Sequence, residues 1–507
     1  MNLEMYTEII DNTENNKAPL IYIIEIGQPE DEYYKFYIGK SSAGHNRPLK
    51  KYPKSVRNFE NGRYRKTYKG GEVIGTRPAW RDNVHPILSE AKKMGWPIKV
   101  TLEPIKEEEL DSAEENKIFE MVSKWGSDKA LNIQLLKAGG ETKERKIFKN
   151  KMNKEQFLYK YLNSYAPVAQ EGEGQDVWQD YIADFCSETK QDAYGTCYGL
   201  IPGSTGTRKH ANKVVIEAHC DEIAWIITNI EKDGMIRVRK HGGSDNMIAP
   251  SKTVLVHTHD GRKVPGVFGW PAIHTRAKRK DLGYADHELW VDCGFDSLEA
   301  VNEAGVEIGC LITFDDILQE MGDYYVGKAL DNKIGGYIIA EVVRRLHDRS
   351  IGLPYDLYVV NSVQEEVGLF GAKKIAKELQ ADLALVTDVC HNTATPKMDE
   401  AKHGPVEGGK GPSLEYASQN HRGILNMLKE VAADKEIPLQ HHVGSYGNDT
   451  VAFFLENTPT AILGMPLKYM HSTVEMAHKE DVETCIELYI EFLKALTPEK
   501  IDEINKR

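Results

Sequence analysis

The chain has 507 residues, too many for one hydrophobic core, so two or three domains are expected. Its 64 lysines and arginines against 77 aspartates and glutamates give a formal net charge of −13 at pH 7. No apolar run is long enough for a membrane-spanning helix, and the first residues lack the basic start of a secretory signal. The sequence therefore argues against an integral membrane protein and favours a cytoplasmic one without a membrane partner.

Charge is distributed unevenly along the chain. The first 150 residues hold 26 of the 64 basic residues but only 23 of the 77 acidic ones, so a weakly basic segment precedes an acidic remainder. Between residues 40 and 99 there are 15 basic and 4 acidic residues, with several tyrosines among them. Because basic side chains neutralise phosphates and aromatic rings stack on bases, this stretch predicts nucleic-acid binding. A solvated, lysine-rich surface is the alternative.

The same segment contains a spaced set of polar and aromatic residues. Two strand-like stretches carry Tyr22 and Tyr37, and Arg47, Glu114 and Asn132 follow in that order. Over residues 18–135 this order resembles the GIY-YIG nuclease domain, a small α+β domain. The resemblance implies a tyrosine near the scissile phosphate, a phosphate-binding arginine, a glutamate that holds one Mg²⁺ and a structural asparagine. A single carboxylate can suffice, because Mg²⁺ keeps several of its waters. Both a nuclease and a domain that only binds nucleic acid are open.

A polar, glycine-containing stretch at residues 137–146 separates this segment from the rest. We therefore expect a first domain over residues 1–140 and a larger region over about 152–500. All seven cysteines lie after residue 185, and none forms a C-x-x-C pair. An odd number of cysteines without such pairing is typical of a reducing compartment such as the cytoplasm.

Potential metal ligands and proton-transfer groups stand after strand-like runs in the second two-thirds of the chain. In chain order they are His219, Asp221, Asp331, Glu365, Glu366, Asp388 and His471. Two imidazoles, three carboxylates and a spare glutamate are what a two-metal hydrolase needs, since paired cations polarise a carbonyl and create a hydroxide at neutral pH. Ligands in α/β sheets gather at the carboxyl ends of strands. Short apolar strands that alternate with helical patterns predict an α/β fold, with a mostly parallel sheet and helices on both faces.

The motifs around these residues resemble the M42 family of metallo-aminopeptidases over residues 152–500. The matching stretches are Ala218-His219-Cys220-Asp221-Glu222-Ile223, Lys328-Ala329-Leu330-Asp331-Asn332-Lys333, Gln364-Glu365-Glu366-Val367-Gly368, Thr387-Asp388-Val389 and Tyr469-Met470-His471-Ser472. The resemblance implies that one metal ion binds His219 and Asp388 and that a second binds Glu366 and His471. Asp331 would bridge the two ions.

The resemblance also implies the remaining roles. Glu365 would be the general base for a metal-bridged hydroxide, and Asp221 would orient His219. The mixed nitrogen and oxygen ligands suit zinc or cobalt, and manganese is a further possibility. His391 is either a group behind the ligands or an ordinary loop histidine. The S-x-x-E pattern at residues 472–475 predicts a helix that begins just after His471.

An insertion is expected between His219 and Asp331, because that stretch is too long for a simple strand-to-helix connection. It contains alternating apolar runs joined by Asp260-Gly261, which is a hairpin signal. We predict a β-rich domain over residues 233–322 that divides the catalytic domain into 152–232 and 323–500. In the resembled family this insert mediates dimerisation, which implies a homo-oligomer. A substrate-neutral β-barrel is the alternative.

The sequence as a whole predicts a fusion of a nucleic-acid-binding domain with an aminopeptidase that removes N-terminal residues from peptides. Two other classes stay open. In one, the protein is a nuclease or nucleic-acid-binding protein whose peptidase fold serves assembly. In the other, the metal scaffold supports a related amide hydrolase such as a deacylase. The preferred first residue of the substrate does not follow from the sequence.

Overall fold

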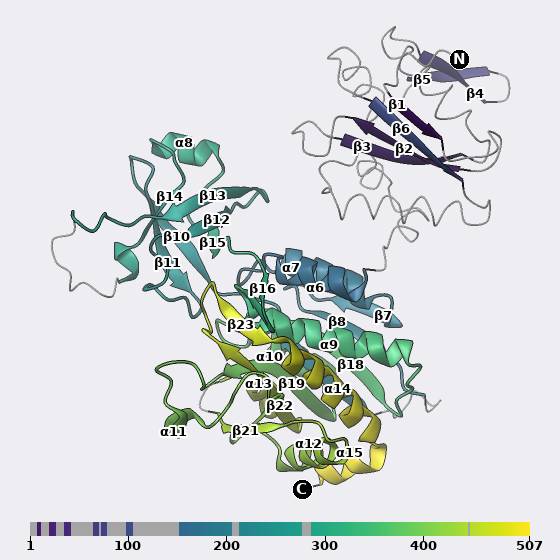
Figure 1. Ribbon diagram of the computed structural model, residues 1–507, viewed down its shortest axis with the longest axis vertical. Coiled ribbons are helices and arrows are strands. Elements are labelled where there is room, and N and C mark those ends of the chain that lie inside the picture. The colour runs from purple at the N-terminus through teal and green to yellow at the C-terminus, as the bar shows by residue number, and fades with distance from the viewer. Residues whose placement is uncertain are drawn as a thin grey trace. The chain divides into compact units, whose positions relative to one another are not determined.

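The computed structural model describes residues 152–204, 212–275, 285–444 and 447–506, together with six strands in the amino-terminal part (Figure 1). The chain forms two compact units, Met1–Asn150 and Lys151–Arg507. None of the described helices is both long and apolar enough to cross a membrane.

The amino-terminal unit contains a four-stranded sheet with the order β1-β6-β2-β3 and a separate two-stranded pair, β4-β5. The strands are β1 (Glu8–Asp11), β2 (Leu20–Ile26), β3 (Lys35–Ser41), β4 (Tyr64–Lys69), β5 (Glu72–Pro78) and β6 (Ile98–Pro104). β2 and β3 pair antiparallel, with Tyr22 opposite Gly39 and Tyr37 opposite Ile24. The predicted Arg47, Glu114 and Asn132 lie outside the described residues.

The second unit is built on an eleven-stranded sheet with the main order β16-β17-β23-β22-β19-β9-β18-β8-β7 and with β20 and β21 branching from β22. The strands are β7 (Glu188–Gln191), β8 (Cys197–Ile201), β9 (Lys213–His219), β16 (Gln319–Met321), β17 (Tyr324–Gly327), β18 (Asp356–Ser362), β19 (Leu383–His391), β20 (Ser413–Tyr416), β21 (Gln440–Val443), β22 (Thr460–Lys468) and β23 (Glu475–His478).

The prediction of a mostly parallel sheet was wrong for the sheet as a whole. The four central strands, β22, β19, β9 and β18, are parallel to one another. On either side of them the strands pair antiparallel, for example β8 with β18 and β23 with β22. The central strands read as long apolar runs in the sequence, because they are covered on both faces. The flanking strands are shorter and partly exposed, so the sequence did not reveal that they pair antiparallel.

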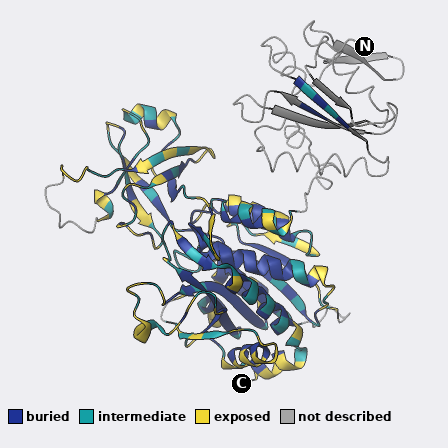
Figure 2. Cartoon of the chain, viewed as in Figure 1, coloured by how far each residue is buried: buried dark blue, intermediate teal, exposed yellow. Residues whose placement is uncertain are grey.

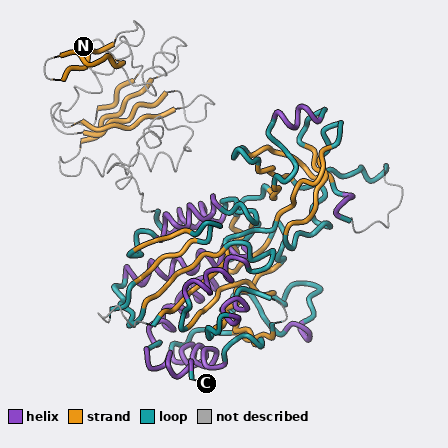
Figure 3. The backbone as a smooth tube through the Cα atoms, turned by 180° about the vertical axis from the view of Figure 1, so that it is seen from behind, coloured by secondary structure: helices purple, strands orange, loops and turns teal. Residues whose placement is uncertain are grey.

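Helices cover both faces of the sheet, as predicted, and the side-chain alternation of β9 shows how. Val214 and Ile216 pack into the core under α6, α7, α9, α12, α14 and α15, whereas Val215 packs on the opposite face with α10 and α13. The helix bounds are α6 (Lys154–Leu162), α7 (Gly172–Ile182), α9 (Leu330–Asp348), α10 (Phe370–Leu379), α12 (Arg422–Asp434), α13 (Thr450–Leu455), α14 (Lys479–Ala495) and α15 (Pro498–Asn505); the short α11 (Glu400–His403) lies outside these layers. The central strands and α9 form the buried interior (Figure 2). Figure 3 shows the same helices and strands from behind.

A closed barrel projects from this α/β body (Figure 1). Its strands are β10 (Ala224–Ile230), β11 (Ile236–His241), β12 (Thr253–His257), β13 (Lys263–Phe268), β14 (Trp290–Asp292) and β15 (Leu311–Phe314), accompanied by η4 (Asp286–Glu288) and α8 (Leu298–Glu303). Trp225 fills the barrel centre, with its ring centroid 4.9 Å from those of both Phe268 and Phe314. β12 and β13 form the expected hairpin.

The boundaries predicted for the insert, 233 and 322, differ from those of the barrel. β10 begins at Ala224 and already belongs to the barrel, whereas β16 at Gln319–Met321 belongs to the large sheet. The reason is that β9 and β10 are two strand-like runs only four residues apart. Their spacing gave no sign that the chain leaves one sheet and enters another between them.

Candidate metal centre

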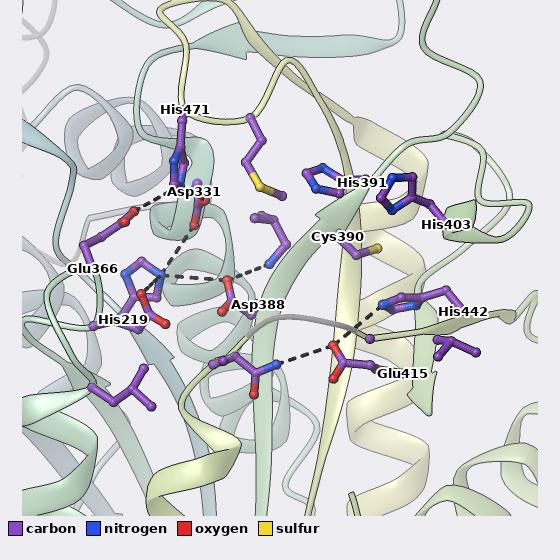
Figure 4. Close-up of a pocket in the computed structure, with 18 of the residues that line it drawn as sticks. His219, Asp331, Glu366, Asp388, Cys390, His391, His403, Glu415, His442 and His471 are labelled. Atoms are coloured by element: carbon purple, nitrogen blue, oxygen red, sulfur yellow. Dashed lines mark hydrogen bonds and ion pairs between the residues drawn. The ribbon is translucent and has the colours of Figure 1, made fainter. Parts of the chain in front are cut away.

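The residues predicted to carry the chemistry converge on one cavity of about 640 Å³. His219 is the last residue of β9, and Glu365 and Glu366 follow β18. Asp331 lies at the start of α9, and His471 lies in the loop between β22 and β23. Figure 4 shows the side chains of His219, Asp331, Glu366 and His471 pointing toward one another. The carboxyl ends of β9 and β18 thus meet the start of a helix and one long loop at the same edge of the sheet.

Asp388 stands within β19 and not at its end. The strand runs from Leu383 to His391 and continues past the site, so the predicted end at residue 388 was wrong. β22 pairs with β19 along this whole length, with Asp388 opposite Gly464, and keeps the backbone extended. Asp388 still reaches the cavity, because its Oδ1 lies 3.8 Å from Nε2 of His219.

One group of potential ligands surrounds His219. Its Nε2 atom lies 3.4 Å from Oδ1 of Asp331, and together with Asp388 the three side chains offer ligand atoms within 4.8 Å of one another. All three residues are buried. One imidazole nitrogen and two carboxylate oxygens at such separations suit a divalent cation such as zinc.

A second group surrounds His471. Its Nε2 atom lies 3.1 Å from Oδ2 of Asp331 and 3.4 Å from Oε1 of Glu366. These three residues also offer ligand atoms within 4.8 Å of one another. Asp331 thus presents one oxygen to each histidine and belongs to both groups. The donor set therefore fits two divalent cations that share one bridging carboxylate.

Burial dominates the electrostatics of the cluster. It raises the pKa of Glu365 to about 10 and raises the pKa values of Glu366 and Asp388 above the usual carboxyl range. Burial alone would also neutralise Asp331 and His471. The hydrogen bonds between imidazole and carboxylate outweigh it, so the pKa of His471 rises to about 12 and that of Asp331 falls.

The cluster contains more carboxyl groups than positive charges. Among the described residues, the ion pairs formed by these carboxyl groups are with His219 and His471, and none is with a lysine or arginine. Burying several carboxyl groups together is costly unless positive charge is supplied. Divalent cations would supply it, which is a second reason why the site suits them.

Asp221 contacts the backbone after β18 more closely than it contacts His219. Its Oδ1 and Oδ2 accept hydrogen bonds from the amides of Glu365 and Glu366, at 3.0 and 3.1 Å. The Nδ1 atom of His219 lies 3.5 Å from Oδ1 of Asp221, at the outer limit for a hydrogen bond. Asp221 therefore fixes the loop that carries the two glutamates and also faces the histidine. The sequence pointed only to the second contact.

Glu475 joins the two halves of the site, and the sequence did not identify it. Its carboxylate accepts hydrogen bonds from the amide of Asp331 at 3.1 Å and from the amide of His471 at 2.7 Å. The prediction that a helix begins after His471 was wrong, because Glu475 opens strand β23 and the next helix begins at Lys479. The S-x-x-E pattern arises from a carboxylate that binds backbone amides across the site and not from a helix cap.

The barrel contributes a backbone contact that was also missed. Nδ1 of His471 lies 3.1 Å from the carbonyl oxygen of Gly243, in the loop after β11. A Cβ atom at position 243 would come within 2.5 Å of the His471 ring, so glycine is required there. With Nδ1 engaged, Nε2 is the nitrogen that faces Asp331 and Glu366.

Comparison with known proteins places this geometry in a family. The profile of the family described as M42 glutamyl aminopeptidase matches residues 199–488. The chain belongs to the M42 family. The lysyl aminopeptidase of Pyrococcus furiosus is 32% identical over 330 residues, which are 64% of this chain and 91% of that protein.

Two solved structures extend the comparison. The aminopeptidase APDkam598 from the archaeon Desulfurococcus kamchatkensis has a TM-score of 0.63 and 30% identity, and covers 69% of this chain and 98% of its own. The Pyrococcus horikoshii TET1 peptidase, which can assemble into a tetrahedron or a large octahedral shell, has a TM-score of 0.60 and 26% identity, with 67% and 98% covered. The chain is therefore an M42-type aminopeptidase, a family of dinuclear metal enzymes. The profile match begins at residue 199 and does not include the amino-terminal unit.

The shared carboxylate leads to a test of metal content. Asp331→Ala removes a ligand from both groups, so we expect the purified variant to lose both metal ions together with its activity. Asp388→Ala removes a ligand from one group only, and we expect it to keep about one ion per chain. Elemental analysis after dialysis against metal-free buffer measures both. Two ions retained in Asp331→Ala would contradict a shared ligand.

Proposed function

We propose that this M42 aminopeptidase holds two divalent cations on the five residues of the two groups and uses Glu365 for proton transfer. His219 and Asp388 would bind one ion, and Glu366 and His471 the other, with Asp331 between them. The observation that supports this most directly is that the two oxygens of Asp331 face different histidines, at 3.4 and 3.1 Å. Zinc or cobalt suits these ligands, and manganese is the alternative.

When bound, such a pair of cations polarises the scissile carbonyl and activates water at neutral pH. The protein itself has to move the proton. Glu365 lies beside the ligands, with Oε2 3.9 Å from Nε2 of His219, yet it belongs to neither group of three. Divalent cations beside Glu365 would favour its ionised form over the neutral form that burial favours, so its carboxylate could take a proton from the attacking water and pass it to the leaving amine. Asp221 would hold Glu365 in place through the backbone hydrogen bond described above.

The substrates are peptides with a free amino end. The named relatives differ in specificity, since the family profile is described as glutamyl and the Pyrococcus furiosus protein as lysyl. The first residue is therefore not fixed by family membership. A deacylase on the same scaffold would act on acylated amines, so activity against aminoacyl substrates and none against their N-acetyl forms separates the two.

The role of Glu365 can be isolated by an isosteric change. Glu365→Gln keeps the shape of the side chain and removes its ability to accept a proton. We expect kcat to fall by roughly 10²–10⁴-fold while both metal ions stay bound. Steady-state kinetics with metal analysis on the same sample tests this, and Glu378→Gln, an exposed position on α10, is the matched control. Near-wild-type turnover in a fully metallated Glu365→Gln variant would remove Glu365 from this role.

We further propose that the barrel mediates assembly of a homo-oligomer, as the sequence resemblance implied. Met247, Ile273 and Ile308 lie in the loops of this segment and are 63%, 64% and 63% exposed. Large apolar side chains such as these lose exposed surface when a second copy of the chain covers them. The assembly of the similar Pyrococcus horikoshii peptidase supports the proposal.

Light scattering coupled to size exclusion measures the assembly. We expect the intact protein to be larger than a monomer and Met247→Asp with Ile273→Asp to yield a smaller species that keeps its fold by circular dichroism. Tyr194→Asp, an exposed aromatic position outside the barrel, is the control. Deleting residues 233–322 would be a poor test, because it would remove the strands that pair with β10. A monomeric wild-type protein would contradict the proposal.

A second candidate function concerns the amino-terminal unit. The antiparallel pairing of β2 with β3 places the backbone segments of Tyr22 and Tyr37 side by side, as two tyrosines of one small site would require. Together with the basic stretch over residues 40–99, this supports nucleic-acid binding, with Mg²⁺-dependent cleavage as the stronger form of the proposal.

The full-length protein should bind DNA or RNA with an affinity that falls steeply as salt rises, because each neutralised phosphate releases counterions. If the unit is also a nuclease, Glu114→Ala should abolish cleavage but keep binding, and Arg47→Ala should weaken cleavage. Peptidase activity should be the same in both variants. Fluorescence anisotropy and a gel cleavage assay measure these effects. No binding at low salt would leave the basic stretch as a solvated surface.

A further inference from the structure

The cavity extends beyond the metal ligands to a second set of polar side chains. This set, which we call the distal wall, consists of His391, His403, Glu415, His442 and Asn448 (Figure 4). A total volume of about 640 Å³ lies within the usual range for small-molecule sites, which is about 300–1,000 Å³. The metal groups occupy one end, so an aminopeptidase has room at the other end for the first side chain of its substrate.

The branch of the large sheet explains why Glu415 faces this space. β20 pairs in parallel with β21, with Glu415 opposite His442, so the two side chains emerge on the same face of the branch. Ser413, two residues earlier, lies on that face as well, and its Oγ is 2.8 Å from Nδ1 of His442. This hydrogen bond fixes the imidazole and turns Nε2 toward the glutamate.

The carboxylate of Glu415 is buried, and its contacts with described residues are long. Its two oxygens lie 3.4 Å from Nδ2 of Asn448 and 3.5 Å from Nδ2 of Asn420. Nε2 of His442 is 3.7 Å away, too far for a hydrogen bond. The residue is 7% exposed, and in the described part of the chain its one ion-pair contact is with this histidine. A buried carboxylate that lacks a strong cationic partner is costly, and a ligand cation would offset that cost.

The rest of the lining suits a long basic side chain. Leu369, Val389 and Met470 supply apolar surface along which a methylene stem can pack. The described lining includes no lysine or arginine, so an acidic side chain would find no strong cation and would face Glu415. The imidazole of His391 is a weak substitute, since burial and the neighbouring His403 lower its pKa and favour its neutral form.

From this geometry we infer that the distal wall is the pocket for the first residue and that Glu415 selects a basic one, lysine or arginine. The inference rests on the proposed aminopeptidase function. The ammonium or guanidinium group would lie against the Glu415 carboxylate, with the ring of His442 beside it. His391, singled out by the sequence as either a group behind the ligands or a loop histidine, belongs to this wall.

Lysyl-p-nitroanilide and norleucyl-p-nitroanilide give a direct test, because their first residues share a four-carbon stem and differ in the terminal ammonium. We expect the metal-loaded wild-type enzyme to show a higher kcat/KM for the lysyl and arginyl substrates than for the norleucyl and glutamyl ones. Glu415→Gln should lower kcat/KM for the lysyl substrate on the order of 100-fold, typical of a buried charge pair that loses one partner. Its kcat/KM for norleucyl-p-nitroanilide should stay within a few-fold of wild type, which also shows that the variant folds.

Two further variants complete the design. Glu407→Gln removes an exposed carboxylate outside the cavity and should leave the preference unchanged. Gly444→Ala retains the charge of Glu415 but would place a Cβ atom 2.1 Å from its Cδ, so it must displace the carboxylate. We expect Gly444→Ala to reduce turnover of the lysyl substrate selectively.

The possible outcomes distinguish a failure of the role of Glu415 from a failure of the aminopeptidase function. A wild-type preference for glutamyl or norleucyl substrates would overturn the role of Glu415 but leave the aminopeptidase function intact. An equal loss on all substrates in Glu415→Gln would also overturn selection by charge. Absence of hydrolysis with every aminoacyl substrate, despite bound metal, would overturn the proposed function and the inference together.

Discussion

The cost of burying carboxyl groups next to one another is the constraint on which the catalytic end of this molecule depends. Asp331, Glu366 and Asp388 are held within a few ångströms of two imidazoles, and burial opposes the charged form of each carboxyl group. Such a cluster is stable only with added positive charge. The carboxyl groups whose burial is unfavourable without cations therefore form a strong ligand set for two cations. Two cations held in this way would supply hydrolytic chemistry.

The surrounding fold keeps these ligands from separating. Glu475 binds the amides of Asp331 and His471, while Asp221 binds the amides of the two adjacent glutamates. Some of the backbone is in the left-handed region, as at His471 with φ 60° and Gln364 with φ 58°. Non-glycine residues adopt this conformation at a cost, which the hydrogen bonds of the two carboxylates help to offset.

Part of this arrangement could be read from the sequence. Apolar runs of strand length end at or shortly before His219, Glu365 and Asp388. Such positions meet at the edge of a parallel sheet, so their convergence was predictable. Glu475 was not recognised, because its partners lie in loops and a local S-x-x-E spacing imitates a helix cap. Glu415 carried no signal, since the role we propose for it depends on a branch of the sheet that the sequence did not reveal.

The number and position of the metal ions decide whether Asp331 is shared between two cations. A crystal structure of the metal-loaded protein, with anomalous scattering measured at the absorption edge of the metal, would locate them. The account predicts two peaks per chain, about 3.5–4 Å apart, with one oxygen of Asp331 on each. A single peak, or two peaks of which neither contacts Asp331, would contradict it.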